Sequence, residues 1–206
     1  MQLRFQTSLT SATYVKQRGW ERANLEHCPA HPGGGCGMRV HSRYTRKHPE
    51  GMQIARYYCR KARQTFSLLP DFLASKFSST LAEVEAVVTV VEASRSLAGA
   101  ARELRPELAD ERHAGRWVRR RLGPVRAALL ALVTLLPELS GCVPRLSAVR
   151  SQLGVSAVLE RLRVLGASYL GALVSPLGFV RRAWRGRARR QRLQQKAGPD
   201  PPEGRQ

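Results

Sequence analysis

The clearest hydrophobic pattern in the chain begins near residue 79, where apolar residues recur at helical spacing as far as about residue 174. Ser79 or Thr80 stands where a helix N-cap is expected, at the start of the segment LAEVEAVVTVVEAS. Its apolar residues are three, three, one and three positions apart, which places them on one helical face: Leu81, Val84, Val87, Val88 and Val91. The pattern predicts an amphipathic helix here.

The same periodicity predicts further helices downstream. A short helix runs from about Leu97 to Leu104, with Ser96 as its cap and Pro106 after its end. A third begins after Asp110 and is expected to be interrupted at 123–124, the Gly-Pro pair. Pro124 would then open a fourth helix that Pro137 ends. A last helix is predicted over 156–173.

The first third of the chain has a different pattern. Residues 27–70 are rich in Gly, Pro, Cys and His, and their β-prone pieces predict short strands over 40–45 and 54–59, with 65–68 as a third. The turn-rich residues 48–51 separate the first two strands. Residues 1–26 show no clear period, so a loosely ordered arm or one short helix is expected there.

Composition adds a strong charge. The 206 residues include 35 Lys+Arg and 15 Asp+Glu, a formal net charge of +20. With 43% hydrophobic residues the chain can bury a core, which excludes disorder throughout. The excess positive charge indicates a polyanionic partner, nucleic acid first and an anionic membrane surface second. Residues 181–206 combine a basic run with a Pro/Gly-rich end, and we expect a disordered tail that binds polyanions without sequence preference.

Cysteine and histidine cluster in residues 27–36, HCPAHPGGGC. Cys28 and His31 have the spacing of one zinc knuckle, and the glycines before Cys36 would let it reach the same ion. Cys59 offers a ligand in a second turn, but Ala62 stands where its mate is expected. We therefore predict a structural zinc site formed by Cys28, His31, Cys36 and Cys59. The alternative is a metal-free ribbon held by its apolar side chains: Tyr44, Tyr58, Phe66 and Leu68.

Four motifs together resemble the N-terminal zinc-ribbon and helix-turn-helix region of bacterial insertion-sequence transposases and transposase-like orphan proteins. They are the knuckle 28–31, the RYTR strand 43–46, the basic strand that ends at Cys59, and TFSLLP at 65–70. The resemblance covers about residues 27–125, and Ala62 departs from it. It implies sequence-directed binding to the DNA at the ends of mobile elements.

These observations predict a mainly α protein with a small β zinc-ribbon-like module near its N-terminus. A helix-turn-helix-like three-helix unit, further helices and a disordered basic tail would follow. The expected divisions are an N-terminal arm (1–26), the zinc-ribbon-like module (27–78), the helix-turn-helix-like unit (79–138), C-terminal helices (139–180) and the tail (181–206).

Arginines share one face of the helix after Asp110. At 100° per residue, these four fall within a sector roughly 100° wide: Arg112, Arg116, Arg119 and Arg120. Val118 and Leu122 lie on another face, Trp117 is assigned to the core, and Arg121 is expected to pair with a carboxylate. Because arginine holds phosphate or guanine through two hydrogen bonds, this face is predicted to contact double-stranded DNA. Arginines on the strands are expected to assist: Arg43, Arg46 and Arg56.

No catalytic constellation is recognisable in the sequence. A transposase needs three carboxylates on an α/β scaffold, and no strand pattern follows residue 80. Glutamates on the predicted helices are expected to face solvent: Glu83, Glu85, Glu92 and Glu103. We therefore expect a protein that is not an enzyme and that takes no small-molecule substrate. Self-association of the chain is possible.

The leading prediction is a DNA-binding protein that lies in the cytoplasm and associates with the nucleoid. Two other interpretations compete with it. One is a membrane-associated basic helical protein that uses the uncharged residues 164–180, although three glycines, two serines and a proline make that segment poorly apolar. The other is a decayed transposase-derived protein without activity. An RNA-binding role ranks below DNA because aromatic residues for base stacking are sparse, at 6%.

Overall fold

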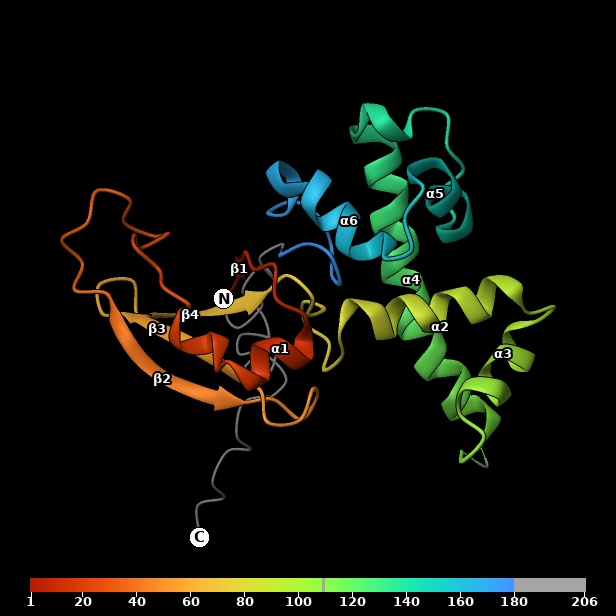
Figure 1. Ribbon diagram of the computed structural model, residues 1–206, viewed down its shortest axis with the longest axis horizontal. Coiled ribbons are helices and arrows are strands. Elements are labelled where there is room, and N and C mark those ends of the chain that lie inside the picture. Colours follow the sequence, from red (N-terminus) through yellow and green to blue (C-terminus); the bar gives the residue numbers. More distant parts are fainter. Residues whose placement is uncertain (109, 180–206) are drawn as a thin grey trace, which may run out of the picture.

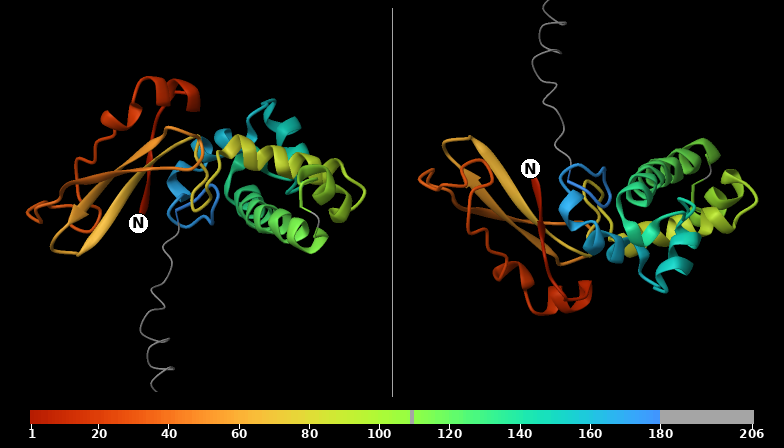
Figure 2. Two further views of the ribbon diagram at one scale, coloured as in Figure 1. Left: turned by 90° about the horizontal axis from the view of Figure 1, so that it is seen from below. Right: turned by 90° about the horizontal axis from the view of Figure 1, so that it is seen from above.

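The computed structural model describes residues 1–108 and 110–179, so the predicted basic tail lies outside the described residues. The chain is mixed α/β rather than mainly α, since a four-stranded sheet stands beside a group of helices (Figure 1). Figure 2 shows the sheet and the helical part side by side along the long axis of the molecule. The last described segment, residues 166–179, lies between them.

The sheet contains β1 (Gln2–Phe5), β2 (Arg39–Thr45), β3 (Gln53–Cys59) and β4 (Gln64–Pro70). Its strand order is β1-β4-β3-β2, with β1 parallel to β4 and the other neighbours antiparallel. The three strands predicted between residues 40 and 68 are confirmed, each slightly longer than expected. The strand β1 was not predicted, because four residues with two apolar side chains give too short a pattern.

Both faces of the sheet carry apolar side chains, because successive residues of a strand point to opposite faces. Tyr57, Cys59 and Phe66 lie in one cluster together with the loop before β2. Ile54 and Leu69 lie in another, which the helix α1 (Ser11–Lys16) and a 3₁₀ turn at Gly19–Glu21 cover. Residues 1–26 therefore contain the short helix that was expected there as the alternative to a loose arm, together with a strand that was not expected.

The helical part consists of α2 (Leu81–Ala93), α3 (Leu97–Leu104), α4 (Glu111–Leu135), α5 (Leu146–Leu153) and α6 (Val158–Leu165), with 3₁₀ turns at Pro137–Leu139 and Ala167–Tyr169. Thr80 caps α2 in a capping box with Glu83, in which each side chain accepts a hydrogen bond from the other residue's backbone amide. Ser96 and Asp110 cap the next two helices as predicted.

The expected break at Pro124 is wrong, because α4 runs through it without interruption. A proline inside a helix removes one backbone hydrogen bond, but buried apolar residues on both sides of Pro124 keep the same face in the core. They are Val118, Leu122, Val125 and Leu129. The last helix is also shorter than predicted, since α6 ends at Leu165 and a 3₁₀ turn follows.

One apolar core joins α2, α4, α5 and α6, so the division predicted at residues 138–139 falls inside it. Two glutamates expected to face solvent are instead part of this packing. Glu85 is buried and accepts hydrogen bonds from the amides of Val158 and Leu159, at the start of α6. Glu92 accepts from the amides of Leu146 and Ser147, at the start of α5. Each carboxylate satisfies helix N–H groups that have no partner within their own helix.

Arg163 joins the sheet part to the helical part. Its side chain is fully buried in α6 and donates hydrogen bonds to the carbonyls of Asp71 and Leu73, just after β4, at 2.8 and 2.6 Å. It also donates to the carbonyls of Pro176 and Leu177. Four backbone acceptors therefore surround one guanidinium, which has five N–H donors.

The uncharged segment that suggested a membrane anchor does not form a long helix. Its described residues, 164–179, comprise the end of α6, a 3₁₀ turn and a loop. Within residues 1–108 and 110–179, no helix has the length and apolar character needed to cross a bilayer.

Candidate metal centre and basic helix face

Three separate pieces of the chain bring the four predicted ligands together. Cys28 and His31 come from one turn, Cys36 follows the glycine run, and Cys59 ends β3. Their ligand atoms all lie within 4.8 Å of one another, so this group could hold a metal ion. Gly34 and Gly35 have positive φ angles, a conformation that side chains disfavour, and this lets the loop return Cys36 to the cluster.

The spacing of the ligand atoms suits a small tetrahedral ion. A zinc ion with ordinary Zn–S and Zn–N bonds of about 2.3 and 2.1 Å holds sulfur and nitrogen about 3.6 Å apart. The Nδ1 atom of His31 lies 3.6 Å from Sγ of Cys28 and 3.4 Å from Sγ of Cys59. Nδ1 is therefore the ring nitrogen that faces the sulfurs.

Each sulfur also accepts a hydrogen bond from a nearby backbone amide. Cys59 accepts from the amide of Ala62 at 3.3 Å, Cys28 from that of Ala30, and Cys36 from that of Met38. Amide donors favour the thiolate form, which is the form that binds metals. Ala62 thus offers its backbone amide to Cys59, and Cys36 is the fourth potential ligand of the cluster.

The thiols differ in how readily they ionise. Burial opposes ionisation of Cys28, but hydrogen bonds from His31 and the Ala30 amide outweigh it and lower the pKa to about 7. Burial raises the pKa of Cys36, and so do the neighbouring sulfurs of Cys28 and Cys59. Three buried thiolates so close together repel one another, and a bound cation relieves that repulsion. The donor set therefore fits a divalent metal.

The apolar surroundings of the cluster differ partly from the predicted set. Phe66 and Leu68 are buried beside the cysteines, as expected. Tyr57 takes the place expected for Tyr58, and its hydroxyl donates to the carbonyl of Ala23 at 3.2 Å. Tyr58 instead lies against the ring of His41, with the centroids 5.7 Å apart.

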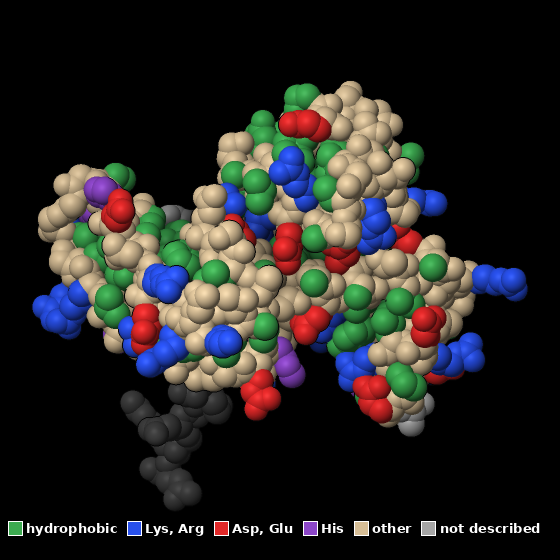
Figure 3. Space-filling model, viewed as in Figure 1, with side chains coloured by type: hydrophobic (Ala, Val, Ile, Leu, Met, Phe, Trp, Pro, Cys, Tyr) green, Lys and Arg blue, Asp and Glu red, His purple; other side chains and the backbone are tan. Residues whose placement is uncertain are grey.

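The four arginines predicted on one face of α4 are all exposed. Ala114, Val118 and Leu122, on the opposite face, are buried. Arg112, Arg116 and Arg119 also line a groove of about 620 Å³ between the start of α4 and Leu97–Ala98 of α3. Figure 3 shows Lys and Arg side chains, with Asp and Glu side chains among them, at the end of the molecule where Figure 1 labels α3. The sequence predicted the arginines but not the groove, which depends on how α3 packs.

Trp117 is half-buried between two arginines. The guanidinium of Arg121 lies 3.8 Å from the ring centroid and that of Arg105 lies 4.8 Å from it. Arg121 therefore stacks on an aromatic ring and does not pair with a carboxylate as expected. This stacking holds the α3–α4 connection against the first half of α4.

The strand arginines occupy three different environments. Arg43 is exposed and lies 4.0 Å from Glu21. Arg56 is half-buried, with its guanidinium 4.7 Å from the ring centroid of Tyr44. Arg46 is buried and donates to the carbonyls of His48 and Phe77, so its guanidinium has no free face for DNA. Arg43 is therefore the one exposed arginine of these three, and it is already close to a carboxylate.

No protein-family model matches this chain, and no curated protein or solved structure is significantly similar to it. The resemblance to transposase N-terminal regions therefore depends on the motifs of the sequence alone.

Proposed function

We propose that this protein binds double-stranded DNA through the first half of α4 and that a zinc ion stabilises its sheet part. The observation that carries the proposal is the four exposed arginines on one face of α4, whose other face is buried in the core. A helix that is anchored on one side and cationic on the other suits the major groove, which admits an α-helix.

The arrangement of α2, α3 and α4 supports this assignment. Helix-turn-helix proteins place the first residues of their last helix against base edges, while preceding helices support it. Here the arginines lie in the first ten residues of α4, and α3 and α2 pack against that helix. The α3–α4 connection is longer than the usual tight turn, and the Trp117 stack fixes it in place.

The role proposed for zinc is structural. One neutral imidazole and three thiolates fill a tetrahedral zinc site completely and leave no position for substrate. When bound, the ion would be held by Cys28, His31, Cys36 and Cys59. It would fix the loop before β2 to the end of β3, because its ligands come from both. The protein would therefore recognise DNA without a catalytic centre of its own.

The DNA target is proposed from the sequence motifs. Their resemblance to transposase N-terminal regions favours the ends of mobile elements or regulatory sites derived from them. A nucleoid-associated location in the cytoplasm goes with that role.

The test is the affinity of the full chain for a duplex at moderate salt. Arg116→Ala combined with Arg119→Ala should weaken binding by at least about tenfold, since each arginine contact contributes roughly 1–3 kcal/mol. The matched control is Arg145→Ala combined with Arg161→Ala, which removes the same charge from exposed positions at α5 and α6. Equal losses in both variants would leave only nonspecific attraction by charge and overturn the proposal.

A further inference from the structure

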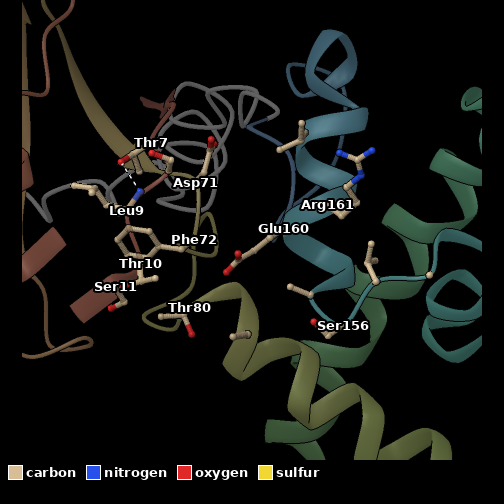
Figure 4. Close-up of a pocket in the computed structure, with 16 residues that line it drawn as sticks. Thr7, Leu9, Thr10, Ser11, Asp71, Phe72, Thr80, Ser156, Glu160 and Arg161 are labelled. Atoms are coloured by element: carbon tan, nitrogen blue, oxygen red, sulfur yellow. Dashed lines mark hydrogen bonds between the residues drawn. The ribbon is translucent and has the colours of Figure 1, made fainter. Parts of the chain in front are cut away.

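The surface is hollowed where the sheet part meets α6. The cleft has a volume of about 720 Å³ and is walled by residues 7–11, by Asp71 and Phe72 after β4, by the start of α2, by residues 154–157 and by Glu160, Arg161 and Val164 of α6 (Figure 4). A neighbouring hollow of about 500 Å³ shares Glu160 with it. Sites for small organic ligands usually measure about 300–1,000 Å³, so the cleft has the size of one.

Glu160 is the charged group that faces this space. Its carboxylate extends from α6 toward Phe72 and Thr80 (Figure 4). The side chain is half-buried, and within the described part of the chain it makes no hydrogen bond or ion pair. Burial and the nearby carboxylate of Glu85 raise the pKa of Glu160, although Arg163 opposes the shift. A partly buried carboxylate without a partner is unfavourable until a cation joins it.

The two other carboxylates beside the cleft have partners of their own. Asp71 receives two hydrogen bonds from Arg4, at 2.7 and 3.0 Å. Glu85 accepts a hydrogen bond from Arg150 at 2.9 Å and caps α6. Arg161 leaves α6 on the side away from the carboxylate of Glu160 (Figure 4). Glu160 is thus the open acidic group of the cleft, in a chain whose net charge is +20.

The remaining lining offers polar and apolar contacts beside this carboxylate. Ser8, Ser11 and Ser156 line the cleft, and their hydroxyls make no hydrogen bond within the described residues. The ring of Phe72 forms part of the same wall. These groups suit a ligand with one cationic end, hydrogen-bonding substituents and an apolar flank.

We propose that this cleft binds a small organic cation, with Glu160 as the counter-ion of a primary ammonium or guanidinium group. The site is separate from the arginine face of α4, so the inference does not depend on DNA binding. Since the walls come from both the sheet part and the helical part, a bound cation would hold the two together.

The test uses the full chain with agmatine, spermidine and phenethylamine as probes, and 1-butanol and 2-phenylethanol as neutral counterparts. Titration calorimetry should detect at least one amine and neither alcohol. Glu160→Gln keeps the shape but removes the charge, and it should weaken that binding by about tenfold or more. Glu138→Gln, at an exposed position in the 3₁₀ turn after α4, should bind as the unaltered chain does.

A second variant tests whether the ligand occupies the cleft itself. Ser156→Phe, at an exposed position on the rim, fills the cleft without replacing Glu160 and should also abolish binding. Failure of every amine to bind at about 1 mM, or equal binding by Glu160→Gln, would overturn the proposal.

Discussion

At the scale of single residues, the ligand atoms of Cys28, His31, Cys36 and Cys59 lie within 4.8 Å of one another, and each sulfur accepts a hydrogen bond from a backbone amide. The knuckle from Cys28 to His31, the glycines before Cys36 and the turn at Cys59 predicted the four residues that the fold brings together, because residue type and loop flexibility are local properties. The amides that donate to the sulfurs were not predicted, because they depend on backbone direction in each turn. The same holds for Arg46, whose carbonyl acceptor on Phe77 lies 31 residues away.

The proposed metal site predicts a specific loss of stability. Cys28→Ser should abolish stoichiometric zinc binding and lower the melting temperature by about 10 °C, since a loss of several kcal/mol shifts a chain of this size by roughly 2–4 °C per kcal/mol. Metal content by mass spectrometry and thermal unfolding of the purified protein measure both effects. Cys142→Ser, at the half-buried cysteine outside the cluster, is the control and should change neither. An unchanged melting curve for Cys28→Ser would contradict the metal site.

At the scale of helices and strands, local signals predicted most elements correctly. Thr80, Ser96 and Asp110 cap their helices where the sequence placed caps. The errors arose where packing outweighs a local signal. Pro124 lies within α4 because the apolar face on both sides of it stays buried, and β1 forms because β4 offers a parallel partner. The local pattern shows neither the core that buries this face of α4 nor the strand that pairs with β1.

The contact between Glu92 and the start of α5 predicts a pH dependence. Burial opposes ionisation of this carboxylate, but the amides of Ser147 and Leu146 outweigh it and lower the pKa of Glu92. A folded-state pKa below the unfolded one stabilises the fold above the unfolded carboxyl pKa of about 4.3, and this contribution is lost as the pH falls further. Glu92→Gln should cost about 1 kcal/mol at pH 7 and less near pH 4.

Urea unfolding at several pH values checks this expectation. The stability difference between the unaltered chain and Glu92→Gln should shrink on acidification, whereas Glu138→Gln should show no such trend. A difference that stays constant from pH 7 to pH 4 would mean that the carboxylate charge does not cap α5.

At the scale of the whole molecule, long-range contacts decide how the parts meet. Arg163 reaches carbonyls about 90 residues earlier in the chain, and the amide of Ser75 donates to the carbonyl of Pro176. The sequence marks Arg163 only as one more cation in an arginine-rich chain. Its burial, and the cleft beside it, follow from the packing of distant segments, which composition and periodicity do not encode.

Arg163 should therefore contribute strongly to overall stability. Arg163→Met leaves four buried carbonyls without their donor and should lower the free energy of unfolding by about 3–5 kcal/mol, measured by chemical denaturation. Arg161→Met, two residues earlier and exposed, should change it by less than about 0.5 kcal/mol. A loss in Arg163→Met as small as that in Arg161→Met would show that the guanidinium does not join the two parts.

The most direct test of DNA binding by α4 is the salt dependence of duplex binding by the full chain. The comparison is with one variant in which Arg112, Arg116, Arg119 and Arg120 are all replaced by alanine. Each phosphate contact adds about 0.9 to the slope of log affinity against log salt. If α4 lies against the duplex, the variant should bind more weakly, with a slope about 2–4 smaller than that of the unaltered chain. Equal affinities and slopes would contradict the account.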